Sequence, residues 1–195
     1  MAPTSEPARI LVVCTGNVCR SPLIERLLVA RLAQRLGERS DRVAVGSAGV
    51  RALVGSSMTV EAAAELRALA GDDAGFVSRQ LTVDLLSGAD LVVTATRQHR
   101  SEAVSRCPKV LRCAFTLREL HRLLVDADLS RLSSDPADRV RELVDLARRR
   151  RGFVLPVEPG EDDVADPYGG SPQQYAATTR QIVPAVELLV DAIAG

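Results

Sequence analysis

The chain has 195 residues, a length that suits a full hydrophobic core, and we expect residues 1–195 to form a single domain. Its 25 Lys and Arg residues balance 25 Asp and Glu residues, so no net field favours nucleic acid or an anionic membrane as a partner. No stretch approaches the roughly 20 apolar residues of a membrane span, and the first residues lack the apolar core of a secretory signal. We therefore expect a cytoplasmic protein whose four cysteines are mostly reduced.

The first part of the chain alternates between apolar, β-branched runs and segments with helical spacing. The run R-I-L-V-V-C is typical of a strand buried on both faces, and the leucines that follow it recur at helical spacing. The pattern predicts strands at 9–14, 43–49, 90–95 and 110–115, and helices at 22–36, 59–70 and 97–106. This order predicts a three-layer α/β fold in which a central parallel sheet of about four strands is flanked by helices.

Beyond the fourth predicted strand the pattern becomes helical and then irregular. Helices are predicted at 117–126 and 136–150, followed by an acidic loop rich in Pro and Gly at 152–170 and an amphipathic helix at 172–194. The segment at about 118–160 is an extended helical addition to the alternating pattern. We expect it to cover one edge of the functional site without supplying catalytic groups.

The loop that joins the first strand to the first helix, V-C-T-G-N-V-C-R-S-P, carries the clearest chemical signal. Ligands of open parallel sheets bind at the carboxyl ends of the strands, where Cys14 lies. Loop amides, the helix N-terminus and the Arg20 guanidinium form a site for phosphate and favour the thiolate of Cys14. Gly16 lets the loop curl, and Ser21 and Pro22 are expected as N-cap and first helical residue. The pattern predicts a cysteine nucleophile in a phosphate-binding loop after strand one.

Cleavage of a phosphate ester also needs a proton donor for the leaving oxygen, and the sequence offers two Asp-Pro pairs. Asp135 precedes a predicted helix, which favours a capping role with Pro136 in the first turn. Asp166 lies in the Gly-rich stretch D-P-Y-G-G-S, a loop able to close over a substrate. Asp166 is therefore the candidate general acid.

Four motifs resemble those of the low-molecular-weight protein tyrosine phosphatases. They are C-T-G-N-V-C-R-S-P at 14–22, S-A-G at 47–49, A-D-L-V-V-T at 89–94 and D-P-Y-G-G at 166–170. They occur in the family's order, although the connection between 115 and 166 is longer than usual for the family. The resemblance implies hydrolysis through a phosphocysteine, in which Cys14 attacks phosphorus, Arg20 and the loop amides hold the phosphate, and Asp166 acts as acid and then base.

The resemblance also implies roles for neighbouring residues. Those expected to contact the phosphate or the substrate are Thr15, Gly16, Asn17, Val18, Cys19, Ser21, Leu53 and Tyr168. Ser21 is expected to hydrogen-bond the Cys14 sulfur, while Asn17 and Ser47 brace the loop. A reversible Cys14–Cys19 disulfide that shields the nucleophile is implied in the same way. No metal or other cofactor is expected, because Arg20 and the amides supply the positive charge.

The substrate is less sharply defined. The partner that the family implies is a phosphotyrosine-containing protein, with a tyrosine kinase among the candidates. A protein arginine phosphatase on the same scaffold is the alternative. In the family, a threonine just before the second loop cysteine accompanies phosphoarginine activity, and Val18 at that position favours phosphotyrosine. Leu53 is the nearest match to an aromatic wall of the substrate pocket, and Tyr168 is expected to supply the remaining wall.

Further hypotheses belong to other classes of protein. A thioredoxin-coupled arsenate reductase needs a cysteine pair just after the third strand, and residues 94–98 contain no thiol. A phosphoprotein-binding module without catalysis would keep its function after Cys14→Ser. A Cys–His dyad acting on acyl groups would employ His99 or His121 but leaves the arginine of the loop unexplained. Cys107 and Cys113 are expected to pack in the core, because their spacing is unusual for a zinc site.

Overall fold

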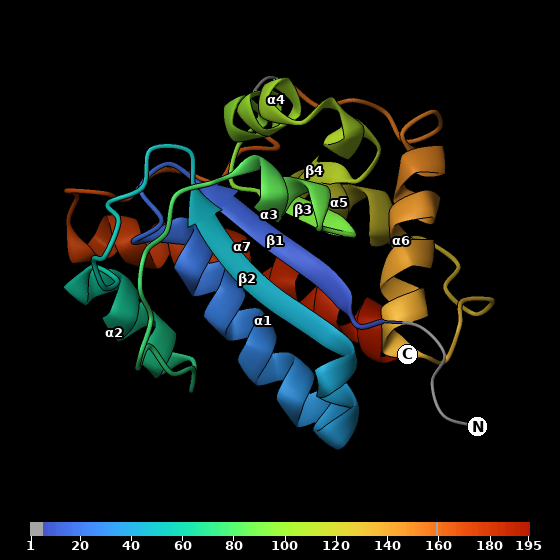
Figure 1. Ribbon diagram of the computed structural model, residues 1–195, viewed down its shortest axis with the longest axis horizontal. Helices are drawn as coiled ribbons and strands as arrows, with labels where there is room; N and C mark the ends of the chain where they lie inside the picture. The colour runs from blue at the N-terminus through green and yellow to red at the C-terminus, as the bar shows by residue number, and fades with distance from the viewer. Residues whose placement is uncertain (1–5, 159) are drawn as a thin grey trace.

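One parallel sheet lies between two layers of helices in the computed structural model, which describes residues 6–158 and 160–195 (Figure 1). The elements, in chain order, are β1 (Ala8–Cys14), α1 (Arg20–Leu36), η1 (Gly37–Arg42), β2 (Val43–Gly49), α2 (Val60–Ala68), α3 (Val83–Ser87), β3 (Leu91–Thr94), α4 (Arg97–Arg106), η2 (Pro108–Arg112), β4 (Ala114–Thr116), α5 (Leu117–Leu124), α6 (Pro136–Arg150) and α7 (Pro172–Ala194). The two η elements are short 3-10 helices. The predicted three-layer α/β fold is confirmed.

The four strands follow the order β2-β1-β3-β4 across the sheet, with β1 in the interior. Cys14 at the end of β1 pairs with Gly49 of β2, and Val13 pairs with Thr94 at the end of β3. Because every strand pair is parallel, the carboxyl ends of the strands meet along one edge of the sheet. Residues that follow β1 and β2 are therefore brought together there.

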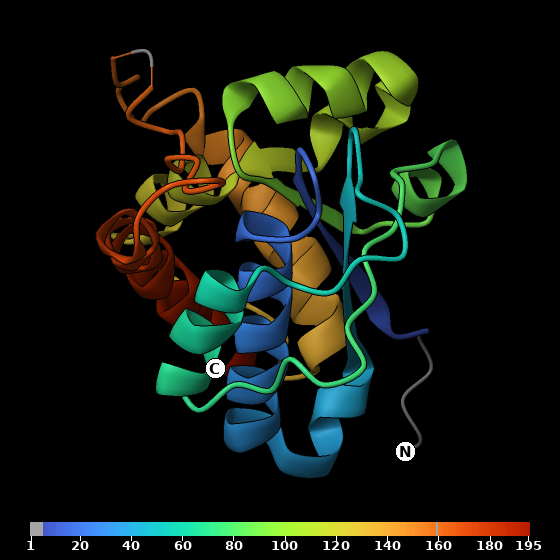
Figure 2. The same cartoon turned by 90° about the vertical axis from the view of Figure 1, so that its left-hand side faces the viewer.

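Helices cover both faces of the sheet, as right-handed crossovers between parallel strands require. The helices α1, α5, α6 and α7 pack together on one face, whereas α3 and α4 lie on the other (Figures 1 and 2). The helix α2 packs against α1 and α7 beyond the sheet. In both views α4 lies near the carboxyl ends of β1 and β2, which places its first turn close to the loop after β1.

The core explains why the first strand and the first helix form where the sequence predicts them. Arg9 is the one exposed residue of β1, so this strand is buried on both faces. The predicted apolar stripe of α1 is buried and consists of Leu23, Leu27, Leu28, Leu32 and Leu36. Fully burying one apolar side chain contributes about 1.5–3 kcal/mol to stability. This is more than the intrinsic preference of a residue for a strand contributes, so burial decides where these elements form.

The predicted boundaries of the fourth strand are wrong. The apolar run at 110–115 was expected to be extended, but η2 occupies its first part and β4 spans only Ala114–Thr116. Pro108 opens η2, since its fixed φ suits the first turn of a helix. Thr116 then caps α5 through a capping box with Glu119, which ends the strand. The short helix α3 was not predicted, because five residues show no periodicity.

The segment at about 118–160 contributes to the layer on the sheet. Its longer helix, α6, packs against β1, β3 and α7 and buries Val140, Leu143 and Ala147. The predicted range of this helix is confirmed, and so is the capping role of Asp135, whose side chain accepts hydrogen bonds from two backbone amides of the first turn. Within the described residues, no helix is both long and apolar enough to cross a membrane.

Candidate active site

The loop after β1 is held open by hydrogen bonds to its carbonyl groups. The amides of Arg51 and Leu53 donate to the carbonyls of Thr15 and Gly16 at 3.0 Å, and the amide of Thr59 donates to the Val18 carbonyl at 2.9 Å. In a trans peptide unit the C=O and N–H groups point in opposite directions. Because these carbonyls point outward, the N–H groups of the same peptide units point toward the inside of the loop. The loop therefore presents donors suited to an anion.

Asn17 fixes the curl of this loop. It is fully buried and adopts a left-handed φ of 56°, a conformation that asparagine tolerates better than most residues. Its side-chain Nδ2 donates to Ser21 Oγ at 2.9 Å and to Ser47 Oγ at 2.7 Å, and its Oδ1 accepts from the amide of Arg79 at 2.9 Å. The loop is thus tied to α1, to β2 and to the segment after α2.

Ser21 lies beside the sulfur of Cys14, with 3.0 Å between Oγ and Sγ. Because Ser21 Oγ already accepts from Asn17, its own hydrogen is available to the sulfur. The predicted N-cap role of Ser21 and the place of Pro22 as first helical residue are wrong. The helix begins two residues earlier, at Arg20, and its cap residue Cys19 makes no side-chain capping bond.

Arg20 is buried beneath the loop and faces Asp166. Its side chain is 4% exposed, and its Nη2 lies 2.7 Å from Asp166 Oδ2. Its Nη1 donates to the carbonyl of Val164 at 3.2 Å, so the guanidinium also anchors the segment that leads to Asp166. The Nε of Arg20 is buried and finds no acceptor among the described residues. Such a donor is suited to an oxygen of a bound anion, because a buried N–H normally has a partner.

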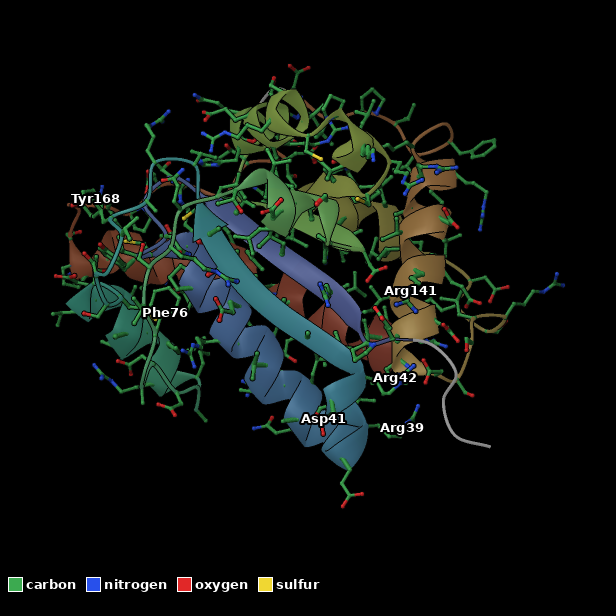
Figure 3. The ribbon with its side chains drawn as sticks, viewed as in Figure 1. Arg39, Asp41, Arg42, Phe76, Arg141 and Tyr168 are labelled. Atoms are coloured by element: carbon green, nitrogen blue, oxygen red, sulfur yellow. The ribbon has the colours of Figure 1, made fainter. Side chains whose placement is uncertain are left out.

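These groups line one pocket of about 160 Å³ at the carboxyl edge of the sheet. Its lining residues are Cys14, Thr15, Gly16, Val18, Cys19, Arg20, Arg51, Leu53, Asp166 and Tyr168. The Cys14 thiol and the Arg20 guanidinium are buried in the interior. The Asp166 side chain is 50% exposed and lies at the rim, as do Leu53 and Tyr168, which are 44% and 61% exposed. Figure 3 shows Tyr168 at the outer edge of the molecule, away from the sheet. The pocket thus combines a polar floor with a rim that carries two apolar side chains and the Asp166 carboxyl group.

Cys19, the second loop cysteine, turns toward the last helix. Its sulfur lies 3.5 Å from the Tyr175 hydroxyl and 3.5 Å from Thr59 Oγ1. Burial raises the pKa of the Cys19 thiol, against hydrogen bonds that act in the other direction. Burial also raises the pKa of Tyr175 to about 12, so its hydroxyl is a donor at neutral pH. Both loop thiols are free.

Four residues that contact the loop were not predicted as site residues. Ser78 Oγ donates to the Gly16 carbonyl at 3.1 Å, Arg79 binds Asn17 and Ser47, Tyr175 contacts Cys19, and His99 Nε2 lies 2.9 Å from Thr15 Oγ1. They come from three different parts of the chain and carry no motif that links them to the loop. The one feature of the sequence that could have pointed to a site residue is the place of His99, in the first turn of a predicted helix that follows a predicted strand.

Cys107, Cys113 and His121 do not line this pocket. Cys107 and Cys113 are buried in the hydrophobic core, as predicted. In the part of the chain that the structure describes, no group of three or more His, Cys, Asp or Glu residues is placed to hold a metal ion.

Comparison with known proteins places this pocket in a family. Residues 9–130 match the sequence profile described as low molecular weight phosphotyrosine protein phosphatase. The chain belongs to this family. It is therefore a hydrolase of phosphoric monoesters, and the predicted family and enzyme class are confirmed.

Individual relatives cover most of the chain. A protein-arginine-phosphatase of Geobacillus stearothermophilus is 29% identical over 188 residues, which are 96% of this chain and 95% of that protein. The low molecular weight protein-tyrosine-phosphatase Wzb of Salmonella typhi is 31% identical over 153 residues, 78% of this chain and 97% of that protein. The crystal structure of the tyrosine phosphatase AmsI of Erwinia amylovora shares the fold, with a TM-score of 0.68, 24% identity and coverage of 97% and 95% of the two chains.

Proposed function

We propose that this phosphatase hydrolyses phosphotyrosine in protein substrates through a phosphocysteine at Cys14. The observation that carries the proposal is the shared pocket, in which the Cys14 thiol, the buried Arg20 guanidinium and the Asp166 carboxyl group line one small space. A thiol, a phosphate-binding cation and a proton donor are the three groups that this reaction needs.

In the first step the Cys14 thiolate attacks phosphorus, and the bond between phosphorus and the phenolic oxygen breaks. Arg20 and the loop amides hold the equatorial oxygens, where charge accumulates. The phosphoryl group replaces the Asp166 carboxylate at Arg20. Asp166 then takes up the proton that the Cys14 thiol loses and gives it to the phenolic oxygen. The half-exposed Asp166 side chain has room for this movement.

In the second step a water molecule attacks the phosphocysteine, and the bond between sulfur and phosphorus breaks. Asp166 accepts the proton of the water, and inorganic phosphate leaves. The Ser21 hydroxyl, 3.0 Å from the sulfur, donates to the departing thiolate and stabilises it. Asn17 and Ser47 keep Ser21 and the loop in place during both steps.

The cellular setting belongs to the same proposal. We place the enzyme in the cytoplasm, where reducing conditions keep Cys14 as a thiol. Phosphorylated tyrosine kinases are among its candidate substrates. Cys19, which shares the loop with Cys14, is the partner we assign for a reversible disulfide under oxidative conditions.

Phosphoarginine is the second candidate substrate. It is favoured by the 29% identity to a protein-arginine-phosphatase over 96% of this chain. Against it stands Val18, which lines the pocket and is 3% exposed. An apolar side chain at this point suits a phenyl ring better than a polar guanidinium, because it offers no hydrogen-bond partner.

The test is phosphate release from a phosphotyrosine peptide and a phosphoarginine peptide, measured side by side with reduced protein and with Cys14→Ser as the blank. We expect Cys14-dependent release that favours phosphotyrosine. Preference for phosphoarginine would overturn the substrate assignment, and release from neither peptide nor from a small aryl phosphate would overturn the proposed activity.

The role of Asp166 is tested by Asp166→Asn, which removes the proton donor and keeps the shape. We expect kcat to fall about 100- to 10,000-fold with phosphotyrosine. The loss should be smaller for an aryl phosphate with a more acidic leaving group, because that oxygen departs without full protonation. Asp135→Asn, at the other Asp-Pro pair, is the matched control. Equal losses for both leaving groups would contradict the assignment.

A further inference from the structure

His99 connects the phosphate-binding loop to α4. It lies in the first turn of that helix and is 5% exposed. Its Nε2 lies 2.9 Å from Thr15 Oγ1, and its Nδ1 lies 2.7 Å from Thr96 Oγ1. Thr15 directly follows the nucleophile and lines the pocket, whereas Thr96 caps α4. One imidazole ring therefore bridges the reacting loop and a helix from the other face of the sheet.

The hydrogen bonds around the ring favour one tautomer. Thr96 Oγ1 accepts the backbone N–H of His99 at 3.3 Å, as an N-cap does. This leaves its single hydroxyl hydrogen free to point to Nδ1, which accepts it in the arrangement that we favour. A neutral imidazole with an accepting Nδ1 carries its hydrogen on Nε2. His99 thus donates to Thr15 Oγ1.

Thr15 receives a second donor from the other side. Arg20 Nη2 lies 3.5 Å from Thr15 Oγ1, so this oxygen faces donors from both His99 and Arg20. When the oxygen accepts from both, the hydrogen of Thr15 is left to point into the pocket. There it meets the position of an anionic oxygen bound by Arg20.

We propose that His99 is a positioning residue of this phosphatase: as a neutral Nε2–H donor it fixes the Thr15 hydroxyl so that Thr15 donates to a phosphoryl oxygen. The proposal rests on the proposed function, because it deepens the account of how the same pocket holds phosphate. His99 acts through Thr15 and does not itself line the pocket.

The charges around His99 keep it neutral. Burial, and then the nearby Arg20 cation, lower the pKa of His99 to about 4. Arg51 acts in the same direction, while Glu102 and Asp166 oppose it. At neutral pH the ring therefore donates a hydrogen bond without adding a cation that would repel Arg20. A neutral donor is the form that the site can accommodate beside its phosphate-binding arginine.

The first test is the tautomer of His99 in the intact, reduced protein. Long-range nitrogen–proton NMR spectra distinguish Nε2–H, Nδ1–H and the cation. The chain contains only two histidines, so His121→Ala assigns both rings. We expect a neutral Nε2–H tautomer for His99 at pH 7 that persists when inorganic phosphate is added. An Nδ1–H tautomer or a cation would overturn the proposal.

The second test measures the affinity for inorganic phosphate and kcat/KM in His99→Ala, His99→Gln, Thr15→Val and the His99→Ala, Thr15→Val double variant. We expect His99→Ala and Thr15→Val each to weaken phosphate binding about 3- to 10-fold, as for the loss of one hydrogen bond. The double variant should lose no more than one single variant, because both remove the same contact. His99→Gln should recover most of the loss, since its amide nitrogen donates from a similar position.

The controls separate this role from a purely structural one. His121→Ala, the same change at the other histidine, should leave phosphate affinity unchanged, and melting curves establish that each variant is folded. Additive losses in the double variant, or no recovery in His99→Gln, would overturn the proposal. If the wild-type protein released no phosphate from any ester, the proposed function would fail, while phosphate affinity and the NMR spectra would still report on His99.

Discussion

Val18 lies in the pocket at the point where the side chain of a substrate follows its phosphoryl group. Val18→Thr keeps the branched shape and replaces one methyl group with a hydroxyl, which can bind a polar guanidinium. We expect the ratio of kcat/KM for phosphoarginine to that for phosphotyrosine to rise about 10-fold, the effect of one net hydrogen bond. Competing turnover of the two peptides measures this ratio.

The same substitution at the exposed Val77 is the control for Val18→Thr, because that residue is 59% exposed and does not line the pocket. An unchanged ratio in folded Val18→Thr protein would show that another part of the pocket selects the substrate.

Residues whose role follows from local sequence or from the family resemblance were predictable, and residues that carry no motif were not. Cys14 and Arg20 are six positions apart in one loop, and this spacing predicts a nucleophile beside a phosphate-binding cation. Asp166 was predictable from its Gly-rich loop, although only the structure brings it to Arg20. His99 and Tyr175 reach the loop from α4 and α7, and their partners follow from the fold rather than from any spacing. For Ser21 the expected N-cap role was wrong, because a serine before a proline resembles a cap. The hydrogen bond to the Cys14 sulfur that the family resemblance implied is confirmed.

At the scale of elements, the N-terminus of α6 is held by an ion pair as well as by its cap. The side chain of Asp135 accepts from the amides of Ala137 and Asp138 and pairs with Arg42, whose Nε lies 3.0 Å from Asp135 Oδ2. Figure 3 shows Arg42 beside the lower end of α6, which is its N-terminal end. The hydrogen bond from Arg42 holds the pKa of Asp135 below its usual range. The folded state therefore favours the charged form of Asp135.

This shift predicts how the stability of Asp135→Asn depends on pH. The amide still caps the helix, so the change removes mainly the charged pair, and we expect a loss of about 1 kcal/mol at pH 7. A folded pKa below the unfolded value of about 3.9 gives stability that is complete above that value and disappears as pH falls through the folded pKa. The difference in melting temperature should therefore shrink below about pH 4.

Asp41→Asn makes the same change of charge in η1, at the residue next to Arg42 (Figure 3). It should alter stability less at pH 7, because Asp41 is exposed. A difference between wild type and Asp135→Asn that stays constant from pH 7 to pH 3 would contradict the role of the pair.

Most elements were predictable because their apolar period matches the face that they bury. The stripe of α1 and the ranges of α6 and α7 follow this rule. The exception between 108 and 116 has a local cause. Its apolar residues suit a strand, but a proline at the start and a capping threonine at the end leave only three residues extended. The proline and the capping threonine, rather than the hydrophobic pattern, therefore set the two ends of this strand.

At the scale of the whole molecule, the site occupies the carboxyl edge of the sheet, whereas α6 packs on one of its faces. The pocket is lined by the loop after β1, the loop after β2 and the segment that contains Asp166. The helix α6 packs on the face of the sheet with α7 and contributes no residue to the lining of the pocket. Stability and catalysis should therefore respond to different substitutions.

Leu143→Ala tests this separation, because Leu143 of α6 is 1% exposed. Removing its side chain leaves a cavity beneath the sheet, and we expect the free energy of unfolding to fall by about 2–5 kcal/mol. Well below the melting temperature, kcat/KM for an aryl phosphate should stay within about twofold of wild type, because stability and catalysis draw on residues without shared contacts. Leu111→Ala, the same change at a residue that is 54% exposed, should alter neither quantity appreciably. A large loss of kcat/KM in folded Leu143→Ala protein would show instead that packing of α6 sets the geometry of the loop after β1.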